Sequence, residues 1–135
     1  MTGEGWVIDA SPLILLGKMQ RLESLEALTA SVAVPECVLA EVASGHGQDA
    51  TTAATLAWAE ARKVPDLRVP VIVTNWDLGP GESQVIAHAL AEALIPVLDD
   101  GEARACALSL SLPMIGTLGI KSRLPLTSPR GLQRR

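Results

Sequence analysis

The apolar positions of this sequence alternate between short runs and longer stretches with helical spacing. The short runs are mostly aliphatic and rich in β-branched residues, and most of them stop at a proline, a glycine or an acid. They occupy residues 6–8, 32–34, 71–73, 95–98 and 113–115. Runs of this length and composition predict buried strands.

Helical spacing fills most of the sequence between these runs. In residues 82–93, apolar side chains recur at 85, 86, 89 and 90, which is the spacing of one helix face. Ser11 followed by Pro12 predicts the start of the first helix, with Ser11 as its N-cap. We expect helices at residues 13–19, 20–29, 36–43, 49–62, 82–93 and 101–110. Because strands alternate with helices, the pattern predicts an α/β fold, in which a parallel sheet of four to five strands is flanked by helices in three layers.

The length of the chain and the end of its pattern define the expected domain. A chain of 135 residues is long enough for one hydrophobic core and too short for two ordinary domains. Beyond Gly119 the sequence contains Pro, Ser and Arg with no sustained period. We therefore expect one domain over residues 1–120 and a basic, Pro-containing tail, disordered in solution, over residues 121–135. No apolar run approaches the ~20 residues that span a bilayer and no signal peptide is evident, so we expect a cytoplasmic protein without a membrane segment.

The charges are unevenly distributed along the chain. The net charge is −4, but residues 1–116 carry 6 basic and 15 acidic side chains, whereas residues 117–135 carry five basic side chains and no acid. An acidic body argues against nucleic-acid binding through a broad phosphate-neutralising surface. Any contact with nucleic acid would depend on a bound metal ion, on local basic residues or on the tail.

Acidic residues follow two predicted strands and lie on two predicted helices. Asp9 ends the first strand, and Asp99 and Asp100 end the strand at 95–98, while Glu41 and Glu82 lie on helices. Open parallel sheets bind ligands at the carboxyl ends of their strands, so we expect these acids at one edge of the sheet. Crowded carboxylates repel one another, and a hard divalent cation such as Mg²⁺ or Mn²⁺ relieves the repulsion by taking oxygen ligands. The acids therefore predict a metal site.

Each acid also has a structural interpretation. Asp9 fits a turn, Glu82 fits the first turn of a helix, where the dipole favours acids, and Glu41 fits a solvated helix face. Asp99 and Asp100 are harder to explain in this way, because two adjacent acids after an apolar strand contribute little to folding. A receiver-like or phosphatase-like domain is a further alternative for this pair. Such a domain needs a phosphoacceptor aspartate and a matching lysine, for which the sequence offers no clear positions.

Five short motifs, taken together, resemble a PIN domain. In chain order they are Val-Ile-Asp-Ala-Ser-Pro-Leu-Ile at 7–14, Val-Pro-Glu at 34–36 with Glu41 following, Gly-Pro-Gly-Glu at 79–82, Leu-Asp-Asp at 98–100 with Ala103 and Arg104, and Gly-Thr-Leu-Gly at 116–119. The resemblance spans residues 6 to about 120. Each motif is weak alone, but their joint spacing is specific. More narrowly, the sequence resembles a prokaryotic PIN-like branch with GPGE and DD...AR signatures, related to VapC-type toxin nucleases.

The resemblance implies a metal-dependent endoribonuclease that uses Mg²⁺ or Mn²⁺, and it extends to the toxin of a toxin/antitoxin pair. By motif, the metal ligands would be Asp9, Glu41, Glu82 and Asp100. Asp99 would be a further catalytic residue, either as an alternate metal ligand or by contacting the ligands without touching the metal. Ser11 and Thr117 would be polar neighbours that orient water or a ligand.

The same resemblance implies the partners and leaves one alternative open. RNA would be the substrate, an antitoxin protein would bind the toxin, and a second copy of the chain would form a homodimer. The alternative is a catalytically silent PIN-like module that serves in binding or regulation.

Overall fold

The fold is built around a four-stranded parallel sheet. The computed structural model describes residues 5–45 and 49–124. The strand order is β3 (Lys63–Val64), β2 (Val32–Pro35), β1 (Trp6–Ile8) and β4 (Ile95–Val97), and every pair runs parallel. Val7 pairs with Ala33 on one side and with Pro96 on the other. The predicted α/β fold with a parallel sheet is therefore confirmed.

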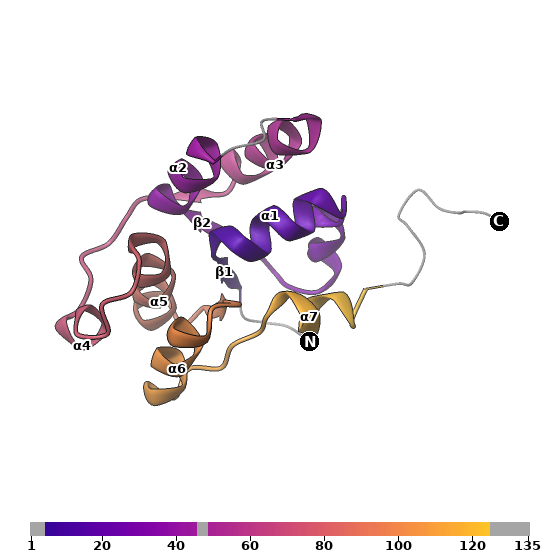
Figure 1. Cartoon of the computed structure of the whole chain (residues 1–135). Coiled ribbons are helices and arrows are strands. Elements are labelled where there is room, and N and C mark those ends of the chain that lie inside the picture. The colour runs from indigo at the N-terminus through magenta and orange to yellow at the C-terminus, as the bar shows by residue number, and fades with distance from the viewer. Residues whose placement is uncertain (1–4, 46–48, 125–135) are drawn as a thin grey trace.

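Helices connect the strands and cover both faces of the sheet. They are α1 (Ala10–Lys18), the 3-10 helix η1 (Leu22–Ala27), α2 (Glu36–Ser44), α3 (Ala50–Glu60), α4 (Val71–Thr74), α5 (Pro80–Glu92), α6 (Gly101–Ser109) and α7 (Thr117–Lys121). Helix α5 contacts β1, β2 and β4 from one side, and α1 lies on the other side together with α7 (Figure 1). At its carboxyl end, β1 is followed almost directly by α1. The carboxyl end of β4 is followed by a short connection and then by α6.

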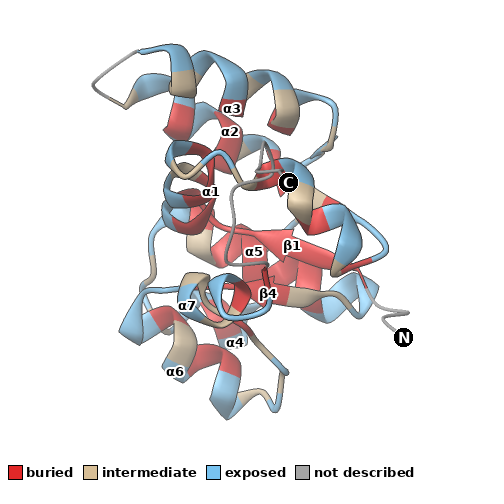
Figure 2. Cartoon of the chain, turned by 90° about the vertical axis from the view of Figure 1, so that its right-hand side faces the viewer, coloured by how far each residue is buried: buried red, intermediate tan, exposed pale blue. Residues whose placement is uncertain are grey.

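The core surrounds the central strand. Trp6, Val7 and Ile8 are all buried, because helices cover both faces of β1, and Figure 2 shows the strands as the buried centre beneath largely exposed outer helix faces. Leu13 and Leu16 of α1 are fully buried in the same core. In the described part of the chain, no helix has the length and apolar character needed to cross a membrane.

The strand predicted at 71–73 is wrong. These residues form the short helix α4, which begins after Pro70 as N-cap. Val73 is buried, whereas Val71 and Ile72 are 73% and 55% exposed, so only one of the three side chains joins the core. Three consecutive β-branched residues favour a strand only where a neighbouring strand can pair with them. Here the position beside β2 is occupied by Lys63–Val64 instead.

The helix starts also differ from the prediction. Helix α1 begins at Ala10 with Asp9 in the N-cap position, two residues before the expected N-cap Ser11, which is exposed. Helix α5 begins at Pro80 after Gly79, two residues before the expected start. Of the strand expected at 113–115, only Ile115 pairs, in a single parallel bridge to Val97.

The end of the described chain packs more closely than expected. Residues 117–121 form α7, in which Ile120 is fully buried, and Leu124 beyond it is also buried. The domain boundary expected at residue 120 therefore falls within a packed segment. Residues 125–135 of the expected tail lie outside the described residues.

Candidate functional site

Asp9 is a buried carboxylate at the centre of the site. It directly follows β1, and its backbone N–H donates to the carbonyl oxygen of Val97 in β4 at 3.2 Å. Its side chain makes no capping bond to α1 and is only 5% exposed. Burial raises the pKa of Asp9 to about 7, against the opposing backbone hydrogen bond of Ala10. A carboxylate with this burial and no capping role is available for binding.

Three further carboxylates act on Asp9 from separate elements. Glu82, Glu41 and Asp100 each add electrostatic repulsion that raises the pKa of Asp9 further. Burial also raises the pKa of Glu82, and Asp100 and Glu41 add to that shift. These side chains come from α5, α2 and the residue before α6. The structure thus brings together four of the five acids that the sequence singled out.

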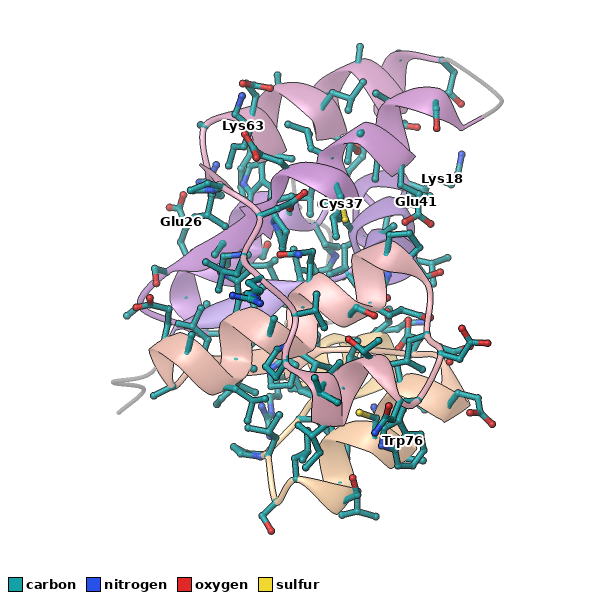
Figure 3. The ribbon with its side chains drawn as sticks, turned by 90° about the vertical axis from the view of Figure 1, so that its left-hand side faces the viewer. Lys18, Glu26, Cys37, Glu41, Lys63 and Trp76 are labelled. Carbon is teal, nitrogen blue, oxygen red and sulfur yellow. The ribbon has the colours of Figure 1, made fainter. Side chains whose placement is uncertain are left out.

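Gly81 lies where α2 and α5 meet at the site. A Cβ atom at this position would lie 2.8 Å from Oε1 of Glu41 and 3.4 Å from Oδ1 of Asp9. The absence of a side chain therefore lets two carboxylates from different elements approach the α5 backbone. Figure 3 shows Glu41 on α2, one turn beyond Cys37. Cys37 is half-buried and free, and burial together with Asp66, Glu41 and Asp9 raises the pKa of its thiol to about 11.

Glu82 and Asp100 are positioned by the backbone of their own helices. Oε1 of Glu82 accepts a hydrogen bond from the N–H of Gly79 at 3.2 Å, as expected for an acid in the third position of a helix. Oδ2 of Asp100 accepts one from the N–H of Ala103 at 3.0 Å and so caps α6. Each of these bonds uses one oxygen of the carboxylate in a structural role.

Asp99 faces a different partner from Asp100. Its Oδ1 accepts a hydrogen bond from the N–H of Thr117 at 2.8 Å, and its Oδ2 accepts one from the Thr117 hydroxyl at 2.5 Å. Asp99 is therefore held against the start of α7, while Asp100 contributes to the field at Asp9. Of the two predicted polar neighbours, Thr117 is engaged with Asp99, and Ser11 is exposed on α1.

The four carboxylates are neighbours, but they do not form a ready-made cage. Within residues 5–45 and 49–124, no three Asp, Glu, His or Cys side chains are grouped so that they could hold a metal ion. The donor chemistry nevertheless fits a hard divalent cation, because all four groups offer oxygen and repel one another without a counter-charge. Bringing three of them to one ion requires changes in side-chain torsion.

Comparison with known families identifies the domain. The family model DUF3368, described as a PIN domain, matches residues 5–124. The chain belongs to this PIN domain family. The match ends at the buried Leu124, so the matched region includes α7 and residues 122–124.

Solved structures share this fold. The crystal structure of PAE2754 from Pyrobaculum aerophilum superposes with a TM-score of 0.62 at 17% sequence identity, covering 89% of this chain and 88% of that chain. At this identity the likeness concerns the PIN fold alone. No curated protein matches the sequence. Membership of the PIN family indicates a nuclease-type function in general terms.

Proposed function

We propose that this PIN domain is a metal-dependent endoribonuclease. The observation that carries the proposal is the buried Asp9 carboxylate, on which Glu82, Glu41 and Asp100 act from three other elements. Neighbouring acids that raise the pKa values of Asp9 and Glu82 destabilise the folded chain unless a cation or protons compensate the charge. Such an arrangement is typical of a functional site, and the helix-terminal bonds of Glu82 and Asp100 do not account for the burial of Asp9 among them.

Asp9, Glu41, Glu82 and Asp100 are the residues that would hold the ion, Mg²⁺ or Mn²⁺. When bound, the ion would supply an activated water and stabilise the charge on the phosphodiester. The protein's own part is to orient the acids: Asp9 at the end of β1, Glu82 and Asp100 through their bonds to Gly79 and Ala103. Asp99, bonded to Thr117, positions α7 beside them.

The biological setting is proposed on the same basis. RNA is the substrate, and the enzyme acts in the cytoplasm as the toxin of a toxin/antitoxin pair. An antitoxin protein then binds the toxin, and a second copy of the chain forms a homodimer. These assignments rest on the motif resemblance and on membership of the PIN family.

The test compares carboxylate variants with a matched control. Labelled single-stranded RNA is incubated with the wild type, Asp9→Asn and Asp100→Asn in Mn²⁺, in Mg²⁺ and in a chelator. Asn retains the α6 cap at position 100, so loss of cleavage there reports on chemistry and not on folding. Asp77→Asn is the control, because Asp77 is exposed with a positive φ of 56° that Asn adopts readily.

We expect metal-dependent cleavage by the wild type and by Asp77→Asn, and none by the other two variants. Thermal melting of each variant verifies the fold. Cleavage that survives both Asp9→Asn and Asp100→Asn would mean that the carboxylate group is not the active site.

A catalytically silent PIN-like module is the second candidate. One observation favours it: among the described residues no three acids are grouped to hold an ion. A silent module should show neither cleavage nor a shift of the melting temperature when Mn²⁺ is added. Metal-dependent cleavage by the wild type rejects this candidate.

A further inference from the structure

We propose that the groove between α6 and α7 binds the backbone of the single-stranded RNA and leads it to the carboxylates. The groove has a volume of about 620 Å³ and is lined mainly by Asp99, Arg104, Met114, Leu118, Ser122 and Arg123. This inference rests on the proposed ribonuclease function and names the surface that receives its substrate.

The groove and the acidic site are adjacent, because consecutive residues of the chain belong to each. Asp99 lines the groove, and the next residue, Asp100, acts on Asp9. Arg104 is held at this edge of the sheet, since its Nη1 donates to the carbonyl oxygen of Leu98, just past the end of β4, at 2.8 Å. A strand lying in the groove would therefore pass beside the carboxylates.

The groove is positive in a chain whose body is acidic. Its one carboxylate, Asp99, already accepts two hydrogen bonds from Thr117. Among the described residues, neither Arg104 nor Arg123 forms an ion pair. Arg123 and the N–H groups of Arg104 other than the one bonded to Leu98 can therefore bind phosphate, a ligand that suits the planar donors of arginine.

Three other cations of the described chain form ion pairs with neighbouring acids. Lys18 pairs with Asp49, Arg62 pairs with Glu26, and Lys63 pairs with Glu60. By contrast, Arg104, Lys121 and Arg123 lie on α6, on α7 and just after it, with no ion pair in residues 5–45 and 49–124. Arg68, which follows β3, also forms no ion pair among the described residues, so what distinguishes the groove is that three such cations lie on neighbouring segments.

The groove also offers an apolar wall and a close backbone floor. Leu118 is 79% exposed and lines the groove together with Met114, so a ribose or base can cover apolar surface there. A Cβ atom on Gly116 would lie 2.9 Å from Oδ1 of Asp99 and 3.0 Å from Nη1 of Arg104. A larger residue at this position would crowd both Asp99 and Arg104. Phosphate-binding cations next to apolar surface match a single strand, which presents phosphates and unpaired bases together.

The test measures binding without cleavage. A fluorescein-labelled 12-nucleotide single-stranded RNA is titrated with the whole protein in a chelator, and anisotropy gives Kd at several salt concentrations. Arg123→Gln is the main variant, because Arg123 is exposed, and Arg104→Gln is the second. Lys63→Gln is the charge-matched control, since Lys63 lies on β3, far from α6 at the bottom of the molecule in Figure 3.

We expect each arginine variant to weaken binding roughly three- to tenfold and to lower the salt slope by about 0.7, the value for one lost phosphate contact on a single strand. Arg123→Lys should retain most of the affinity, and Lys63→Gln should bind like the wild type. Unchanged affinity and slope in Arg123→Gln would overturn the proposal. So would an acidic peptide, polyglutamate, that competes as well as unlabelled RNA, because the groove would then suit an acidic protein segment.

The same measurements separate this proposal from the proposed function. If the wild type binds RNA through the arginines but never cleaves it in Mn²⁺, the ribonuclease assignment fails and the groove assignment stands. If the wild type cleaves RNA and Arg123→Gln has an unchanged KM, the groove assignment fails and the ribonuclease assignment stands.

Discussion

Asp99 and Thr117 are joined by two hydrogen bonds, from the Thr117 amide at 2.8 Å and from its hydroxyl at 2.5 Å. The pair connects the residue after β4 to the first residue of α7. Because both oxygens of Asp99 are used, the adjacent Asp100 is the one left to act with Asp9. The two neighbouring aspartates thus have different partners: Asp99 is bonded to Thr117, whereas Asp100 caps α6 and acts on Asp9.

The Asp99 pair should contribute to stability. Thr117→Val removes the hydroxyl donor and keeps the side-chain shape, so we expect the free energy of unfolding to fall by about 1 kcal/mol. Thr117→Ser, which keeps the hydroxyl, should stay close to the wild type. Urea denaturation of the three proteins measures the difference. Equal midpoints for Thr117→Val and the wild type would show that the hydroxyl bond is not stabilising.

The raised pKa of Asp9 predicts a pH dependence of the metal-free protein. Asp9 titrates near pH 4 in the unfolded chain and at about 7 in the folded chain, so the folded state binds the extra proton between these values. The free energy of unfolding should therefore fall as pH rises from about 4 to about 7, by on the order of 2–4 kcal/mol from this group.

Thermal melts in a chelator between pH 4.5 and 8 measure this dependence. Asp9→Asn should flatten the decline and should be more stable than the wild type at pH 8. Addition of Mn²⁺ at pH 8 should raise the melting temperature of the wild type more than that of the variant. A wild type whose stability rises over this range would contradict the assignment.

Gly81 should matter for the metal and little for the fold. In Gly81→Ala, the new Cβ would meet Oε1 of Glu41 at 2.8 Å, so this flexible carboxylate must move. We expect Mn²⁺ affinity to fall about tenfold, as for residues that position metal ligands. Gly101→Ala is the control, because its Cβ would meet no atom within 4 Å. Isothermal titration with Mn²⁺ compares the two, and equal affinities would reject the role of Gly81.

Helix α7 should be an integral part of the folded domain. Ile120 is fully buried, so Ile120→Ala should lower the free energy of unfolding by about 2–4 kcal/mol. Leu118→Ala in the same helix changes a side chain that is 79% exposed, and its effect should stay within about 0.5 kcal/mol. Chemical denaturation measures both, and equal losses would mean that α7 does not pack as described.

The apolar pattern of the sequence correctly predicted the elements whose residues are almost all apolar and buried. The runs at 6–8, 32–34 and 95–98 became β1, β2 and β4, because apolar strands covered on both faces leave a continuous pattern. Helix α7 was missed because its buried Ile120 stands among Gly, Lys, Ser and Arg, without a period. The two-residue β3 offers no pattern at all, and it exists only because β2 lies beside it.

The composition of the candidate site was accessible from the sequence, but its internal arrangement was not. Acids after parallel strands predict one shared edge, which is why Asp9 and Asp100 could be named together. The bond between Asp99 and Thr117 joins residues 18 positions apart, and only the folded chain shows which of two adjacent aspartates forms it. The close approach of Glu41 to Gly81 likewise depends on how α2 packs on α5.

The two edges of the sheet, β3 and β4, determine whether a strand of another molecule can pair with it. At one edge β3 has only two residues, and its Lys63 is exposed. At the other edge, Pro96 of β4 has no N–H to donate to a further strand. Its carbonyl oxygen already accepts a hydrogen bond from the N–H of Ile115, which lies two residues before α7. Short, charged or proline-containing edges resist pairing with strands of other chains. The two edges of the described sheet are therefore poorly suited to pairing with a strand of another chain, which disfavours edge-to-edge aggregation.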